Sequence, residues 1–193
     1  MTAQESLFKD LFNLPFDHSL GTAFVKIFAH RHSEFINSVE VRGSPAFRVR
    51  TRDALEFLQS SPSFGTARNH ISVIRQGRRS GMKAWAEKPA FIVGAATWRH
   101  SAVWYAGAIA HDAYHAKLYC DAKGGNRGKQ PDNDAWTGAE AEKVCLAFQR
   151  QVLLELHADD KIIAYIDHCA INPTYQGHPT GWRSWLDYLR RWW

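Results

Sequence analysis

The sequence predicts an α+β protein that is mostly helical, with a small sheet preceding its longest helix. Apolar residues recur at helical spacing over residues 98–120 and again over 138–157, so we expect two long helices there. A short apolar segment with β-branched residues, KPAFIVG (88–94), precedes the first helix and predicts a strand. A polar, glycine-rich loop at 121–134 separates the two helices. Strands followed by a run of helices are typical of the α+β class.

The remaining elements are predicted from caps, turns and short apolar runs. Thr97 is the expected N-cap of the first long helix. Before residue 88 we expect a helix at 4–14, an apolar segment at 21–30, a hairpin of strands 35–41 and 46–50 around Gly43-Ser44-Pro45, a helix from its cap Thr51 to Ser61-Pro62, and a helix at 67–76. After residue 157 we expect a further short element or a helix extension at 161–168, a loop at 172–181 and an amphipathic, Trp-rich helix at 182–193.

Length and composition fit one globular domain. The chain has 193 residues, of which 45% are hydrophobic and 22% charged, as in ordinary globular proteins. Its three cysteines include no CxxC pair, and an odd number argues against a full disulfide framework. The N-terminal apolar run contains Lys9 and Asp10, which a signal peptide would not. The longest uncharged apolar stretch, Ser101–Ala110, is too short to span a membrane. We therefore expect a cytoplasmic protein without a membrane partner.

The positive charge alone does not predict a nucleic-acid ligand. The formal net charge is +5, but Lys and Arg are mixed with acidic residues rather than gathered in one patch. Arg78-Arg79 and Arg190-Arg191 lie near aromatic residues, a combination that suits single strands. The second pair is better explained as part of an amphipathic helix whose tryptophans pack on the body of the protein.

The candidate site begins with two histidines in the first long helix. In AGAIAHDAYHAKLY (106–119), His111 and His115 are four residues apart and therefore share one helix face. Two imidazoles so placed can reach one metal ion at about 2.0–2.1 Å. Asp112 lies in an otherwise apolar stretch, where an unpaired carboxylate is costly unless it has a partner or a function.

A third candidate ligand opens the second long helix. Thr137 to Glu140 fits a capping box, which would give Glu140 a structural role. Glu142 has no such role, and its neighbours at helical spacing are apolar, so its carboxylate is expected to face the core. The alternative for Glu142 is a surface salt bridge.

Together these residues resemble the glutamate-type zincin metallopeptidases, whose motif is written HExxH…E. The segment His111-Asp112-Ala113-Tyr114-His115 matches the first part, and Glu142 follows His115 by 27 positions. Glu142-x-x-Cys145-Leu146-Ala147-Phe148 is similar to the ExxA-x-x-F pattern around that glutamate. Residues 89–97 occupy the place of the edge strand that pairs with an extended substrate in such folds. The similarity covers residues 88–157 of an expected single zincin-like domain (1–193), flanked by N-terminal helices and hairpin (1–87) and a Trp-rich segment (158–193).

The resemblance implies a zinc-dependent hydrolase acting on peptide or protein substrates. His111, His115 and Glu142 would bind Zn²⁺ and leave a fourth position for water. Asp112 would be the general base, although the family has a Glu there, one methylene longer. Tyr175 and His178 are candidate donors to the developing oxyanion by residue type. Two carboxylates, Asp167 and Asp187, are candidate partners for the ligand histidines.

Two other functions remain open from the residues alone. Because Asp112 departs from the zincin pattern, the chain is alternatively a zinc-binding protein without catalytic activity. His100 and the His111-Asp112 pair also suggest a metal-dependent phosphohydrolase of the HD type. Against that reading, His100 falls in the same predicted helix as His111, and His115 would have no role.

Overall fold

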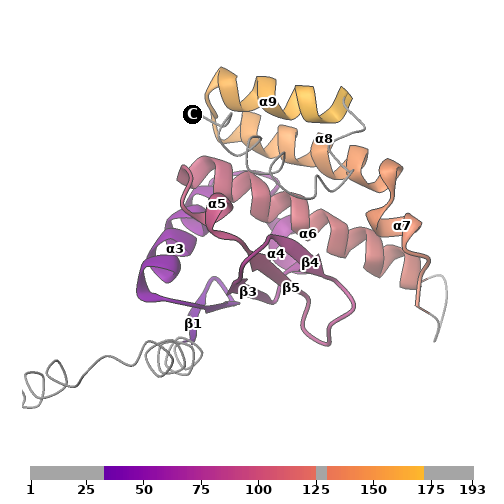
Figure 1. The fold of residues 1–193 in the computed structure, drawn as a ribbon, viewed down its shortest axis with the longest axis horizontal. Helices are drawn as coiled ribbons and strands as arrows, with labels where there is room; N and C mark the ends of the chain where they lie inside the picture. The colour runs from indigo at the N-terminus through magenta and orange to yellow at the C-terminus, as the bar shows by residue number, and fades with distance from the viewer. Residues whose placement is uncertain (1–32, 125–129, 172–193) are drawn as a thin grey trace, which may run out of the picture. The chain divides into compact units, whose positions relative to one another are not determined.

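The computed structural model describes residues 33–124 and 130–171, which belong to one compact unit beginning at Ser33. The elements expected at 4–14, 21–30, 172–181 and 182–193 lie outside the described residues. Within them the α+β prediction is confirmed, because a five-stranded mixed sheet is combined with a larger set of helices (Figure 1).

The sheet has the strand order β1-β2-β3-β5-β4. Its strands are β1 (Ser33–Ile36), β2 (Val39–Arg42), β3 (Val73–Gln76), β4 (Gly81–Lys83) and β5 (Ala90–Val93). The central pairs β2–β3 and β3–β5 are parallel, whereas the outer pairs β1–β2 and β4–β5 are antiparallel. The predicted strand at 88–94 is therefore confirmed as β5. The resemblance placed it at the edge, which is wrong, because β4 pairs beyond it and forms that edge of the sheet.

The predicted hairpin is wrong in its position. The turn lies at Asn37 and Ser38, whose φ angles of 50° and 71° match the two central residues of a type I′ turn. Residues 35–41 thus span β1, the turn and β2 rather than one strand. Helix α3 (Pro45–Gln59) replaces the predicted strand at 46–50, since Ser44 Oγ accepts a hydrogen bond from the Phe47 amide and Pro45 starts the helix.

Two predicted helix caps and one predicted helix also differ from the structure. Thr51 lies inside α3, where its hydroxyl donates to the Phe47 carbonyl at 2.8 Å and contacts Tyr105 Oη at 2.9 Å. The predicted helix at 67–76 is divided between α4 (Phe64–His70) and β3. Thr97 belongs to the short α5 (Ala95–Trp98), and Ser101 Oγ accepts from the Trp104 amide at the start of the next helix.

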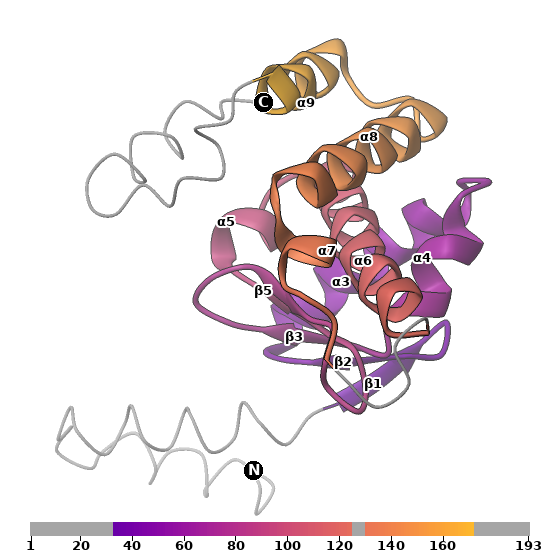
Figure 2. The ribbon, with the colours of Figure 1, turned by 90° about the vertical axis from the view of Figure 1, so that its right-hand side faces the viewer.

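Helix α6 (Ala102–Gly124) lies at the centre of the unit. It packs against α3, α4, β4 and β5 on one side, and against α8 (Ala139–Glu155) on the other. The short α7 (Asp134–Thr137) contacts both α6 and α8, and α9 (Asp160–Ile171) packs on α8 as a separate helix. Figure 2 shows these layers from the sheet through α6 to α8 and α9. In the described residues, no helix is both long and apolar enough to cross a membrane.

One glycine permits α6 and α8 to approach closely. A Cβ atom built on Gly107 would lie 2.8 Å from Leu153 Cδ2 and 3.0 Å from Leu153 Cγ, closer than side chains tolerate. Leu153 is fully buried in a cluster that also contains Trp104 and residues of α9. The absence of a side chain at Gly107 therefore helps to set the separation of the two helices that carry the candidate ligands.

Candidate metal centre

His111 and His115 come from the middle of α6, where the helix is buried by its neighbours. Their positions one turn apart bring the two Nε2 atoms to 3.1 Å from each other. His115 is buried, and the side chain of His111 is 12% exposed. The predicted pairing of these two histidines on one helix face is confirmed.

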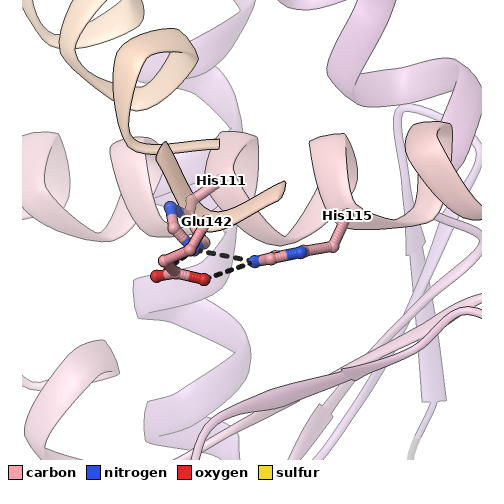
Figure 3. A group of neighbouring side chains, drawn as sticks. All are labelled: His111, His115 and Glu142. Carbon is pink, nitrogen blue, oxygen red and sulfur yellow. Dashed lines mark hydrogen bonds and ion pairs between the residues drawn. The ribbon is translucent and has the colours of Figure 1, made fainter. Parts of the chain in front are cut away.

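Glu142 reaches the same point from the first turns of α8. Its Oε1 lies 3.4 Å from His111 Nε2 and its Oε2 lies 3.1 Å from His115 Nε2 (Figure 3). The side chain is 14% exposed, so the carboxylate faces inward and not into solvent. The predicted capping box beside it is wrong. Gly138 is the N-cap and makes no side-chain cap, while Glu140 pairs with Lys143.

A backbone carbonyl fixes the orientation of the His115 ring. His115 Nδ1 lies 2.6 Å from the carbonyl oxygen of Trp136 in α7. Because a carbonyl only accepts, Nδ1 must carry the proton and donate it. In the neutral imidazole Nε2 then holds the lone pair, and it points to His111 and Glu142. A hydrogen bond of this kind is the usual outer partner of a metal-binding histidine.

The three side chains converge closely enough to share one metal ion. Four ligands at about 2.0–2.1 Å from a central zinc ion are separated by about 3.3–3.4 Å along each tetrahedral edge. The two imidazole nitrogens are 3.1 Å apart, while the contacts of 3.4 Å from His111 and 3.1 Å from His115 reach different oxygens of Glu142. One atom from each of the three residues can share a metal ion, and we call these residues the metal group. Within the described part of the chain no fourth side chain joins the group, so three protein ligands would leave one position open.

The electrostatics of the group are those of a carboxylate between two imidazoles. Burial alone would raise the pKa of Glu142, but hydrogen bonds and attraction from His111 and His115 outweigh it and hold that pKa far below its usual range. Burial alone would lower the pKa of His115, whereas its interactions with Cys145 and Glu142 raise that pKa well above the ordinary value. Without a metal, the carboxylate is therefore paired with a protonated His115, and a metal ion bound here would take the place of that proton.

Asp112 lies beside the three groups without joining them. Burial raises the pKa of Asp112 to about 6, against the opposing influence of His111 and His115. No hydrogen bond or ion pair from the described residues reaches its carboxylate. As a carboxylate next to the candidate metal centre, Asp112 remains the candidate general base.

Three features of the site were not predicted from the sequence. The fully buried Cys145 interacts with His115, and burial is the main reason that the pKa of its thiol is raised. Cys145 is nevertheless absent from the group that can share one metal ion. His111 Nδ1 is buried and has no hydrogen-bond partner among the described residues. The Trp136 carbonyl had no sequence signal, because every residue carries a carbonyl.

The other sequence-derived candidates do not meet at this centre. Tyr175, His178 and Asp187 lie outside the described residues. Asp167 forms an ion pair with Arg150, with 2.6 Å between Oδ1 and Nε, and is thereby occupied. His100 precedes α6, where its Nδ1 accepts from the Ser101 amide, and it is not part of the metal group.

Comparison with known proteins does not assign the chain to a family. The chain matches no protein family model, no curated protein and no solved structure. The functional argument therefore depends on the geometry of this site.

Proposed function

We propose that the protein is a zinc-dependent hydrolase of the metallopeptidase type, acting on peptide bonds. The observation that supports this best is the convergence of His111, His115 and Glu142 on one point, where three protein ligands would leave a fourth position for water. Structural zinc sites usually have four protein ligands, whereas catalytic sites usually have three and keep a place for water. A zinc ion bound here would supply Lewis-acid activation of that water.

The residues of the chain would have three roles, which are to hold the metal, to orient a ligand and to transfer protons. Glu142 and the two histidines hold the site, and the Trp136 carbonyl keeps the His115 ring in its productive tautomer. Asp112 would accept the proton of the attacking water and deliver it to the leaving nitrogen of the peptide. Its side chain is one methylene shorter than the glutamate of the zincins, so the reach of Asp112 is the critical element of this proposal.

The edge strand β4 supports a peptide as the substrate. Beyond β4 no described strand pairs with it, so its outer backbone groups remain available to an extended chain. Helix α6, which carries both histidines, packs directly against β4. An extended peptide can add to such an edge as a further antiparallel or parallel strand, and its backbone would then run along the metal-binding helix.

The activity test compares variants at Asp112 that leave the ligands intact. The zinc-loaded full chain should cleave members of a fluorescence-quenched peptide library. Asp112→Asn should retain zinc and lose about 100-fold to 10,000-fold in kcat/KM, because it cannot accept a proton. Asp112→Glu restores both the carboxylate and the family's reach, so it should retain activity.

Two results would contradict the proposal. If Asp112→Asn cleaves as fast as the wild type, then Asp112 is not the base. If the wild type binds one zinc ion and cleaves no peptide, then the alternative of a zinc-binding protein without catalytic activity is favoured. An HD-type phosphohydrolase is disfavoured, because His100 lies outside the metal group.

A further inference from the structure

An exposed tryptophan follows the edge strand directly. Trp85 is separated from the end of β4 by one residue and is 52% exposed, although it is among the largest apolar side chains of the chain. Its ring packs against that of Trp136, with 5.6 Å between centroids and an interplanar angle of 64°. One part of the indole is therefore held by the protein while the remainder faces solvent.

The partner of Trp85 connects it to the metal centre. Trp136 is 6% exposed and belongs to a cluster with Ala84, Ala116 and Tyr119. The backbone carbonyl of the same Trp136 accepts the hydrogen bond from His115 Nδ1 at 2.6 Å. Two direct contacts thus lead from the exposed indole to a candidate zinc ligand, and Ala116 and Tyr119 extend the cluster along α6 beyond His115.

We infer that Trp85 forms a subsite that selects an aromatic side chain of a peptide bound at the metal centre. This inference depends on the proposed function and specifies its substrate class. A peptide that runs along β4 passes Trp85 where the strand ends, so one of its side chains can lie on the indole. Because Trp136 supports the ring from behind, the surface is fixed before binding, and little conformational freedom is lost on contact.

Aromatic rings are the side chains that this surface favours most. Two aromatic rings gain an interaction beyond the area that they bury, through offset or edge-to-face contact. The expected gain over an alanine side chain is about tenfold in Kd. An aliphatic side chain would gain only the free energy of burying its apolar surface, without the additional interaction between two rings.

The experiment measures binding of two zinc chelators that differ in one side chain. N-acetyl-phenylalanine hydroxamate and N-acetyl-alanine hydroxamate are titrated into the zinc-loaded full chain by calorimetry. The wild type should bind the phenylalanine compound about tenfold more tightly. Trp85→Ala should reduce this ratio to about one with the Kd of the alanine compound unchanged, which also shows that the variant is folded. Trp85→Phe should keep most of the preference. Phe57→Ala removes another exposed aromatic residue, 46% exposed on α3, and should leave the ratio as it is.

The possible failures are distinguishable from one another. If both hydroxamates bind and the wild type shows no preference, or if Trp85→Ala keeps the preference, this inference is overturned while the open metal site stands. If neither hydroxamate binds to the wild type carrying one zinc ion, the open site itself is refuted, and the subsite with it.

Discussion

His70 and His115 each donate a hydrogen bond to a backbone carbonyl, yet only His115 has the surroundings of a metal ligand. His70 Nδ1 lies 2.7 Å from the Thr66 carbonyl of its own helix, and the residue is outside the metal group. His115 Nδ1 lies 2.6 Å from the Trp136 carbonyl, and its Nε2 faces a second imidazole and a carboxylate. A fixed ring alone is thus a common structural feature, whereas the convergence at Nε2 distinguishes the candidate ligand.

The sequence predicted the convergence of His111, His115 and Glu142 better than the surroundings of these candidate ligands. Helical spacing alone placed His111 and His115 together, and the inward position of Glu142 followed from its apolar neighbours. The Cys145 contact to His115 and the Trp136 carbonyl depend on how α7 and α8 pack onto α6. Such contacts join residues far apart in the chain, so they cannot be predicted from local sequence patterns.

A single carboxylate, Glu155, joins the end of α8 to the start of α4. It accepts hydrogen bonds from Ser61 Oγ, from Gln151 Nε2 at 2.9 Å, and from Ser63 Oγ at 2.9 Å and the Ser63 amide at 3.1 Å. Burial alone would raise the pKa of Glu155, but these hydrogen bonds outweigh it and lower that pKa below its ordinary value.

Glu155→Gln should therefore destabilise the protein in a pH-dependent manner. A folded-state pKa below the unfolded value of about 4.3 means that ionised Glu155 stabilises the fold above that pH, and that this contribution disappears as the pH falls through the folded pKa. We expect Glu155→Gln to lower the free energy of unfolding by about 1 kcal/mol near neutral pH. The difference from the wild type should shrink as the pH falls below about 4.3 and through the lowered pKa of Glu155.

Urea unfolding at a series of pH values checks this expectation. Glu140→Gln is the matched control, because Glu140 pairs only with the exposed Lys143 and should change stability by less than about 0.5 kcal/mol. A Glu155→Gln deficit that grows toward acid pH would contradict the account of this carboxylate.

At the scale of elements, the long helices were predicted well and the short elements poorly. The helices expected at 98–120 and 138–157 are confirmed as α6 and α8, because many turns of apolar periodicity define each. The segment 35–41 contains parts of both β1 and β2 together with the turn at Asn37-Ser38, which the apolar residues on either side made look like one continuous strand. Ser44-Pro45 was taken as a hairpin loop, although the same residues form an N-cap and first helical position.

A substitution at Gly107 tests whether the close contact of α6 and α8 keeps the candidate ligands in position. Gly107→Ala should lower the free energy of unfolding by about 1–3 kcal/mol, because Leu153 must move away from the added methyl group. The displacement would also separate Glu142 from the histidines, so zinc affinity should fall. Both quantities are measurable, by urea unfolding of the metal-free protein and by competition with a chromophoric chelator.

Gly65→Ala is the matched control for this substitution. It also lies in a helix, α4, but an added Cβ would meet no atom within 4 Å. Alanine should stabilise that helix by up to about 1 kcal/mol and leave zinc affinity unchanged. A Gly107→Ala variant as stable as the wild type, with equal zinc affinity, would show that the close contact does not determine the site.

At the scale of the whole molecule, the order of strands could not be predicted from the sequence. β3 and β5 pair in parallel although β4 lies between them in the chain. Which strand becomes an edge depends on these long-range pairings rather than on the composition of a segment. The expectation that residues 89–97 supply the edge was therefore wrong, whereas the class of fold, which follows from the types and order of the elements, was confirmed.

The same architecture explains why the metal group forms where it does. α6 is placed between the sheet and α8, so a helix face bearing two histidines is buried against a helix whose first turn carries Glu142. Removal of any one ligand should leave this packing mostly intact, because Val152, Leu153 and Ile109 remain buried between the layers. Metal binding can thus be tested without disrupting the fold.

Zinc stoichiometry by elemental analysis tests the central claim most directly. It is measured on the purified wild type, on His115→Ala and Glu142→Gln, and on His70→Ala, a control that removes a histidine outside the metal group. The account predicts about one zinc ion per chain in the wild type and in His70→Ala, and a large loss in both ligand variants. A wild type that takes up no zinc when zinc is supplied, or ligand variants that bind as much as the wild type, would contradict it.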